Sequence, residues 1–206
     1  MATLLVTASD TGVGKTRVAG MLARALAVRG RVQVVKPVEA GAPGGHPHDA
    51  PEAAGDWAEP HTLVSLPFPL APLAEGQGEV TLALVLDRLA ALPPADHRVI
   101  EGAGGVGVPL DRSGADWADV AAAVRPDLAV IVVDDRLGAI NQARLAHAYL
   151  ASRAPGVRVG VWLNAVRADP DPALARSNRA GLAGLGIPLV GESRHGASRP
   201  ERMELP

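Results

Sequence analysis

Residues 8–16 read Ala-Ser-Asp-Thr-Gly-Val-Gly-Lys-Thr and constrain the fold of this chain more than any other stretch. An apolar run precedes them, and a helical pattern begins near Lys15. A strand, a glycine-rich turn and a helix N-terminus in this order form a phosphate-binding loop, in which Gly12 and Gly14 let backbone N–H groups point at an anion. The sequence therefore predicts a phosphate site. The alternative is a turn that only caps the helix, because Ser9 stands where the general pattern has glycine.

Lysine is rare in this chain, and both lysines fall where a nucleotide would need them. The chain has 20 basic residues, but only Lys15 and Lys36 are lysines. Where arginine supplies nearly all positive charge, we expect a lysine to be needed as a compact ammonium. Lys15 lies in the phosphate-binding loop and Lys36 ends the next predicted strand, so a parallel sheet would bring both to its carboxyl edge. Thr16 adds a hydroxyl that suits a magnesium ion.

The composition favours a globular protein and excludes several classes of function. The chain has 206 residues, of which 48% are hydrophobic, and a formal net charge of −2, so we expect one domain spanning residues 1–206. No basic run or basic patch with interleaved aromatic residues is present, which argues against a nucleic-acid partner. The absence of cysteine excludes disulfides, cysteine nucleophiles and thiolate metal sites. No segment has membrane-spanning length or a signal-peptide pattern, so we expect a cytoplasmic protein with no membrane partner.

Apolar strands alternate with helical patterns along the chain. The expected strands lie near residues 2–7, 32–36, 97–101, 128–133, 157–163 and 187–190. The expected helices lie at residues 15–29, 79–91, 139–152 and 171–185, with a further one starting at residue 116. This alternation predicts an α/β fold: a doubly wound, mostly parallel sheet with helices on both faces, of the P-loop nucleoside triphosphate hydrolase type.

Residues 37–78 are rich in glycine and proline and interrupt this alternation. We expect Pro37 to stop the second strand. We expect the stretch to form an irregular cover over the substrate, with one short helix near residues 49–55. His46 and His48 flank a proline and could bind a metal, but histidines in a glycine-rich loop are more often solvated, so zinc is the weaker interpretation.

A strand predicted to end at Glu101 is followed by Gly-Ala-Gly-Gly-Val-Gly at residues 102–107. These residues match the dinucleotide pattern G-x-G-x-x-G, but that pattern must open a helix, and Pro109 disfavours a helix here. We therefore reject a NAD-type site. We expect Glu101 to bind magnesium directly or through water, with the glycines letting backbone approach a nucleotide. The alternative is a surface acid that precedes a glycine turn.

Polar residues also follow two later strands. Asp134 and Asp135 could bind a metal, although a solvated strand end is the more common role for such a pair. Asn164 could read the edge of a base with one donor and one acceptor, or it could cap a turn. The sequence leaves both interpretations of Asn164 open.

Five segments occur in the order and spacing of one enzyme family, at residues 9–16, 36–41, 101–105, 115–117 and 137–141. Through them the chain resembles the dethiobiotin synthetases over nearly its whole length. The resemblance implies an ATP-dependent enzyme that closes a ureido ring on 7,8-diaminononanoate with CO2. A carbamate of the substrate amine would take the γ-phosphate of ATP, and the resulting carbamic–phosphoric anhydride would be closed by the second amine.

The resemblance also implies roles for individual residues. Catalytic groups would be Lys36, Lys15 and Thr11. ATP and its cation would be bound by Gly12, Val13, Gly14, Lys15, Thr16, Asp49, Glu101, Gly102, Ala103, Gly104, Asn164, Glu192 and Ser193. Magnesium ligands would be Thr16, Asp49 and Glu101. Substrate contacts would come from Lys36, Ala40, Gly138 and Asn141. The family is a homodimer, and the last two residues would contact the substrate of the neighbouring subunit. Ala40 stands where the family has a serine.

A related P-loop ATPase of the same fold is the alternative function, either an amidotransferring synthetase or a partitioning-type switch. Partitioning ATPases carry an additional lysine early in the phosphate-binding loop, and residues 8–11 contain none. Their attachment to DNA or membranes needs basic or amphipathic tails, which this sequence lacks. The sequence therefore favours a biosynthetic enzyme that uses ATP and Mg²⁺.

Overall fold

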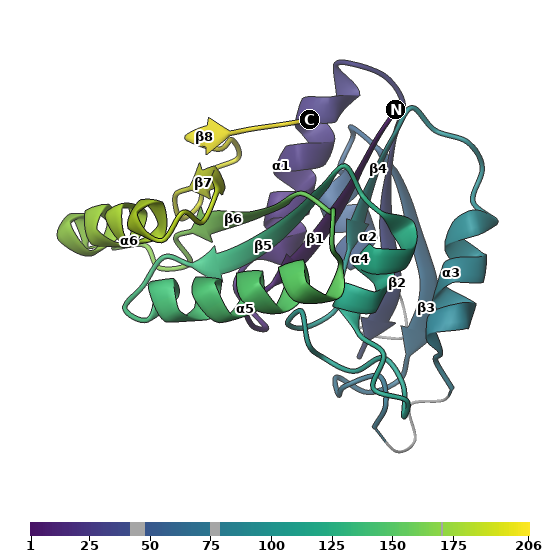
Figure 1. Ribbon diagram of the computed structural model, residues 1–206. Helices are drawn as coiled ribbons and strands as arrows, with labels where there is room; N and C mark the ends of the chain where they lie inside the picture. The colour runs from purple at the N-terminus through teal and green to yellow at the C-terminus, as the bar shows by residue number, and fades with distance from the viewer. Residues whose placement is uncertain (42–47, 75–78, 170) are drawn as a thin grey trace.

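The computed structural model describes residues 1–41, 48–74, 79–169 and 171–206. These residues form an eight-stranded sheet in the order β3-β2-β4-β1-β5-β6-β7-β8 (Figure 1). Within them, all neighbouring strands pair in parallel except β8, which runs antiparallel to β7. The strands are β1 (Ala2–Ala8), β2 (Val32–Ala40), β3 (Glu59–Leu66), β4 (His97–Glu101), β5 (Leu128–Asp134), β6 (Val159–Asn164), β7 (Leu189–Ser193) and β8 (Arg202–Met203).

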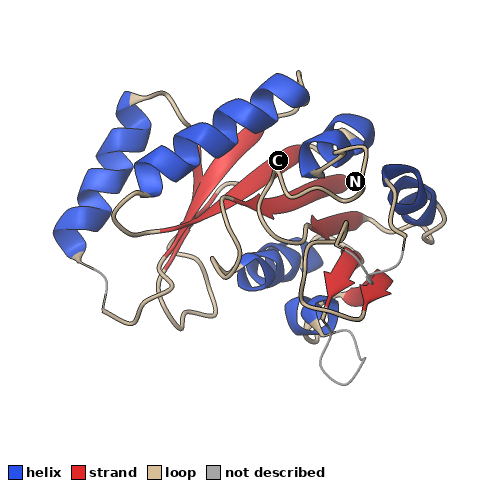
Figure 2. Cartoon of the chain, turned by 90° about the horizontal axis from the view of Figure 1, so that it is seen from below, coloured by secondary structure: helices blue, strands red, loops and turns tan. Residues whose placement is uncertain are grey.

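Helices cover both faces of the sheet, as Figure 2 shows. One face carries α1 (Lys15–Ala27) and α2 (Asp49–Ala54). The other face carries α3 (Leu82–Ala90), α4 (Trp117–Val124), α5 (Ala139–Arg153) and α6 (Pro172–Gly184). This arrangement confirms the doubly wound, mostly parallel α/β fold that the sequence predicts. Across the described ranges, no helix combines the length and the apolar character needed to cross a membrane.

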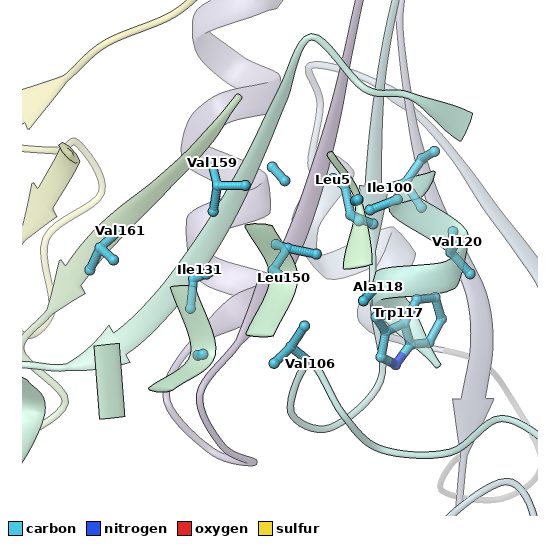
Figure 3. Packing of buried hydrophobic residues seen from close by; sticks show 14 of the residues in the cluster. Leu5, Ile100, Val106, Trp117, Ala118, Val120, Ile131, Leu150, Val159 and Val161 are labelled. Carbon is cyan, nitrogen blue, oxygen red and sulfur yellow. The ribbon is translucent and has the colours of Figure 1, made fainter. Parts of the chain in front are cut away.

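Alternating side chains let β1 contribute to both layers. Leu4 and Val6 belong to the core that contains α1, whereas Leu5 belongs to the core that contains α4 and α5. Figure 3 shows Leu5 and Ile100, from neighbouring strands, in the same cluster as Trp117 of α4. Because helices cover both faces, nearly every position of such a strand is apolar, and the sequence pattern is correspondingly clear.

Pro37 lies inside β2 instead of ending it, so the predicted end of this strand is wrong. β2 pairs with β4 as far as Val35 and with β3 as far as Ala40. The N–H group that Pro37 lacks therefore falls beyond the pairing with β4, where its absence costs no ladder hydrogen bond to that strand. β2 consequently continues past Lys36 to Ala40.

The stretch predicted to be irregular contains β3, a strand not expected from the sequence. β3 is an edge strand that begins Glu-Pro-His-Thr and is only partly buried, so it lacks the continuous apolar run of a central strand. The two residues of β8 are too few to show any pattern. The short helix expected near residues 49–55 is present as α2. His46 lies outside the described residues.

Candidate active site

The phosphate-binding loop connects the end of β1 to the start of α1 at the carboxyl edge of the sheet. Gly12 and Gly14 have φ angles of 77° and 93°, in the left-handed region that favours glycine. A Cβ atom on residue 14 would lie 2.3 Å from Nδ2 of Asn164, so no side chain fits there. The same Nδ2 donates a hydrogen bond to the carbonyl oxygen of Val13 at 2.8 Å. The end of β6 thus holds the loop in place.

Lys15 is the buried first residue of α1. Its Nζ donates a hydrogen bond to the carbonyl oxygen of Asp10 at 3.2 Å. Burial, together with the nearby positive charge of Lys36, lowers the pKa of Lys15 to about 8. A bound anion would favour the ammonium form again, so the electrostatics of the loop suit a phosphate group.

Lys36 lies in the middle of β2 with its Nζ between two carboxylates. The Nζ atom is 2.6 Å from Oδ2 of Asp49, at the start of α2, and 2.7 Å from Oε1 of Glu101, at the end of β4. Burial opposes the charged form, but the attraction of Glu101 and Asp49 outweighs it, so the pKa of Lys36 is raised above its ordinary value. Lys36 is therefore an ammonium group at neutral pH.

Glu101 is fully buried and also accepts a hydrogen bond from the hydroxyl of Thr16 at 2.8 Å. Burial raises the pKa of Glu101, while Lys36 and Thr16 limit the increase. Its second oxygen, Oε2, has no hydrogen-bond partner among the described residues. Burying a carboxylate oxygen without a hydrogen-bond partner costs folding free energy unless a ligand binds to it. Together with the carboxylate of Asp49 and the hydroxyl of Thr16, Glu101 supplies the hard oxygen donors that fit magnesium.

These side chains face one cavity of about 500 Å³. Residues 69–72, from the segment that follows β3, also line it. The residues expected at the site that line this cavity are Thr11, Gly12, Gly14, Lys15, Thr16, Lys36, Ala40, Asp49, Glu101, Ala103 and Gly104. Its size is within the range of pockets that bind small molecules.

The residues expected near a nucleotide base are grouped at the ends of β6 and β7, outside the lining of this cavity. Ser193 Oγ donates to Oδ1 of Asn164 at 2.7 Å and accepts a hydrogen bond from the indole N–H of Trp162 at 2.9 Å. Glu192 forms an ion pair with Arg179 of α6. Asn164 thus connects the phosphate-binding loop to the end of β7.

Comparison with known proteins identifies the family. A family model described as an AAA domain matches residues 2–192. The ATP-dependent dethiobiotin synthetase BioD of Frankia casuarinae is 36% identical in an alignment that covers 100% of this chain and 89% of that protein. The enzyme of the same name from Anaeromyxobacter dehalogenans is 40% identical, and its alignment covers 83% of this chain and 80% of that protein. This chain belongs to the dethiobiotin synthetase family.

Solved structures share the fold of this dethiobiotin synthetase family member at much lower identity. The structure of a plasmid partition protein from Borrelia burgdorferi bound to AMPPNP has a TM-score of 0.60 and 13% identity, covering 95% of this chain and 87% of that chain. A ParA family ATPase from Chlorobium tepidum has a TM-score of 0.55 and 17% identity, covering 94% of this chain and 82% of that chain. Likeness at this level shows the P-loop ATPase fold alone.

Two residues of this chain are expected to contact substrate because it resembles the dethiobiotin synthetases. Both lie away from the cavity, at the N-terminus of α5. Gly138 is the N-cap residue, with a φ angle of 96°, and Asn141 is exposed in the first turn. Neither lines the cavity that contains Lys36. The two groups of substrate residues are therefore separate within one chain.

Asp134 and Asp135 do not act as a pair. Asp134 forms an ion pair with Arg136 at 3.3 Å, whereas Asp135 accepts a hydrogen bond from the side chain of Asn178 at 2.6 Å. Both carboxylates thus have partners within the chain, which differs from the solvated strand end that the sequence favours. Residues 102–107 form a loop, and this confirms that they do not open a helix.

Trp117 is a buried residue for which the sequence indicates no role, although it belongs to a segment shared with the dethiobiotin synthetases. Its indole N–H donates to the carbonyl oxygen of Ala103 at 2.7 Å. A Cβ atom on residue 102 would lie 2.9 Å from the indole ring, so Gly102 is needed for this close approach. Trp117 therefore supports the loop that follows Glu101. A glycine directly after an acid at a strand end was the available signal, because such a glycine often marks close packing.

Proposed function

We propose that this protein converts 7,8-diaminononanoate, CO2 and ATP into dethiobiotin, ADP and phosphate, with Mg²⁺ as cofactor. One observation carries the proposal: the two lysines of the chain and the oxygen donors of Thr16, Asp49 and Glu101 lie together at one cavity. Membership of the dethiobiotin synthetase family supplies the reaction.

Lys36 would act at the transferring phosphoryl group. A carbamate on one substrate amine attacks the γ-phosphorus of ATP, the bond to the β-phosphate oxygen breaks, and ADP leaves. Negative charge spreads over the transferring oxygens, and fixed ammonium groups stabilise it without a covalent step. Lys36 and Lys15 would supply that charge, with Lys36 also binding the carbamate oxygen. Thr11 would lie beside the carbamate.

Thr16, Asp49 and Glu101 would hold the cation, which when bound neutralises charge on the β- and γ-phosphates. The unpartnered Oε2 of Glu101 supports this assignment. The backbone of residues 12–16 would bind the phosphates, and Gly102, Ala103 and Gly104 would let the nucleotide approach the main chain. Ring closure then follows when the second amine attacks the carbamic carbon and phosphate leaves.

Asn164, Glu192 and Ser193 would contact the base of ATP. Asn164 retains donor and acceptor capacity beyond its contacts with Val13 and Ser193, because a primary amide has two N–H groups and two oxygen lone pairs. The same three residues lie at the carboxyl edge of the sheet, where nucleotides bind in this class of fold.

A homodimer would complete the substrate site. Leu137, Asn141, Leu145 and Tyr149 follow one another at four-residue spacing and form an exposed stripe on α5 and the turn before it. Leu137 and Leu145 are 79% and 64% exposed, which is unusual for large apolar side chains. A second subunit packed on this stripe would bury them and would bring the α5 N-terminus, with Gly138, to the substrate carboxylate of its partner.

Phosphate release from ATP in the presence of Mg²⁺ and bicarbonate, measured with and without 7,8-diaminononanoate, tests the proposal. We expect release to depend on the diamine and dethiobiotin to appear in equal amount. Release that is indifferent to the diamine, or none at all, would contradict it and favour the related ATPases of the same fold.

A further inference from the structure

Glu39 is a buried carboxylate that the proposed mechanism does not use. It lies on β2 three residues after Lys36 and is 2% exposed. Its Oε1 accepts hydrogen bonds from the backbone N–H groups of His48 at 2.8 Å and of Asp49 at 3.3 Å. The same oxygen is 2.9 Å from Nδ1 of His48. One oxygen of Glu39 therefore binds the start of α2.

The start of α2 is also where Asp49 contacts Lys36. Residues 49–54 are too few for a helix to be stable by itself, so its position must be set by contacts with the rest of the protein. No side chain of α2 caps its own N-terminus, and Glu39 supplies the missing acceptor. Movement of these N–H groups would move the Asp49 carboxylate with them.

We infer that Glu39 is a positioning residue that fixes Asp49 against Lys36 and in the geometry needed by the cation. This inference rests on the proposed function of Asp49. The contact joins β2 to α2, so β2 carries both Lys36 and Glu39, the residue that orients Asp49. Residues that orient a metal ligand typically change metal affinity about 10- to 100-fold when they are altered.

A metal ion bound by Glu39, His48 and Asp49 themselves is the competing interpretation, since ligand atoms of the three lie within 4.8 Å of one another. Oε1 of Glu39 already accepts two backbone hydrogen bonds and contacts the imidazole. A cation there would displace these bonds from the helix start. The hydrogen-bonding role accounts for every contact of this oxygen, and we therefore prefer it.

Two substitutions separate geometry from charge. Glu39→Gln keeps an oxygen at the position of Oε1, whereas Glu39→Asp keeps the charge but withdraws the carboxylate by one methylene. Under the inference, Glu39→Asp raises the Mg²⁺ concentration for half-maximal phosphate release about tenfold, with kcat at saturating Mg²⁺ within about threefold of the unaltered protein. Glu39→Gln behaves like the unaltered protein. The reverse order, or no change in Glu39→Asp, would overturn the inference.

A second readout needs no metal, nucleotide or turnover. Because Lys15 and Lys36 are the only lysines, lysine labelled with ¹³C at the ε-carbon gives two side-chain signals, which Lys15→Arg assigns. Glu39→Asp should shift the Lys36 signal more than that of Lys15, because Asp49 contacts Lys36 directly and acts on Lys15 only through its charge, and Glu39→Gln should leave both unchanged. Thr62→Val is the matched control, because its hydroxyl lies 3.5 Å from the other oxygen of Glu39. If the unaltered protein shows no diamine-dependent phosphate release, the proposed function is wrong. If the Lys36 signal does not shift in Glu39→Asp, this inference is wrong.

Discussion

Lys36 has an environment that an arginine cannot reproduce. Its Nζ lies within 2.7 Å of two different carboxylates, which a compact ammonium can do because its three donors point in separate directions. A guanidinium is planar and larger, and it would displace Asp49 or Glu101. The identity of this residue is thus set by geometry as well as by charge.

Lys36→Arg should therefore lower kcat by about a hundredfold or more while the fold is retained, because the point charge proposed to act at the phosphoryl group is lost. Single-turnover phosphate release and circular dichroism measure the two effects. Arg31→Lys exchanges the same residue types at an exposed position and should change neither. Near-normal turnover by Lys36→Arg would remove the assigned role of Lys36.

The lowered pKa of Lys15 predicts that nucleotide binding depends on pH. With a pKa of about 8, Lys15 is largely charged at pH 6.5 and largely neutral at pH 9. Phosphate favours the ammonium form, so ADP should bind with uptake of about half a proton at pH 8, with less uptake at pH 6.5 and weaker binding at pH 9. Calorimetry in buffers of different ionisation enthalpy measures the uptake. An uptake that is constant over this range would contradict the lowered pKa.

At the scale of elements, the start of α4 supports the loop after Glu101. Asp116 caps this helix: its side chain accepts from the N–H of Ala118 at 2.7 Å and its own N–H donates to Asp119 at 2.9 Å. Asp116 is also buried and accepts a hydrogen bond from the hydroxyl of Tyr149 in α5. One carboxylate therefore joins two helices beneath the site.

Asp116→Ala should reduce the free energy of unfolding by about 2 kcal/mol, because it removes a helix cap and leaves polar groups unpaired. Tyr149→Phe removes only the hydroxyl contact and should cost about half as much. Urea denaturation at equal m-values measures both. An equal decrease in the free energy of unfolding in the two variants would mean that the helix cap contributes nothing to stability.

The central strands could be predicted because two covered faces leave a nearly continuous apolar run, as in residues 128–133. β3 could not, because an edge strand beginning Glu-Pro-His-Thr has the composition of a loop. Pro37 looks like a strand end for a different reason. Whether a proline breaks a strand depends on where the neighbouring strand β4 stops, and only the paired sheet shows that.

The candidate site was predictable where its residues follow strands. Glu101 ends β4 and Lys15 follows the loop after β1, and the carboxyl ends of parallel strands share one edge of the sheet. The role proposed for Glu39 could not be predicted, since it depends on hydrogen bonds to the backbone N–H groups of His48 and Asp49 that leave no periodic pattern. For Trp117, whose indole binds the carbonyl oxygen of Ala103, the glycine at position 102 was the only signal.

At the scale of the whole molecule, the exposed stripe on α5 predicts assembly. Leu145→Glu should convert the proposed homodimer to a monomer in sedimentation velocity, because a charge would replace an apolar contact at the proposed interface. Diamine-dependent phosphate release should fall at least about tenfold, while ADP binding is unchanged. Leu185→Glu, at an exposed apolar position beyond α6, is the matched control. A Leu145→Glu protein that remains dimeric would contradict this interface.

β4 lies between β1 and β2 in the sheet, although it follows both in the chain. During synthesis on the ribosome, β1, α1 and β2 therefore emerge before the strand that separates them. Direct pairing of β1 with β2 would close the slot that residues 97–101 must enter, and would exclude Glu101 from the two lysines. Native assembly of the sheet centre thus waits until β4 has left the exit tunnel, and a nascent chain that pairs too early must open again before it can mature.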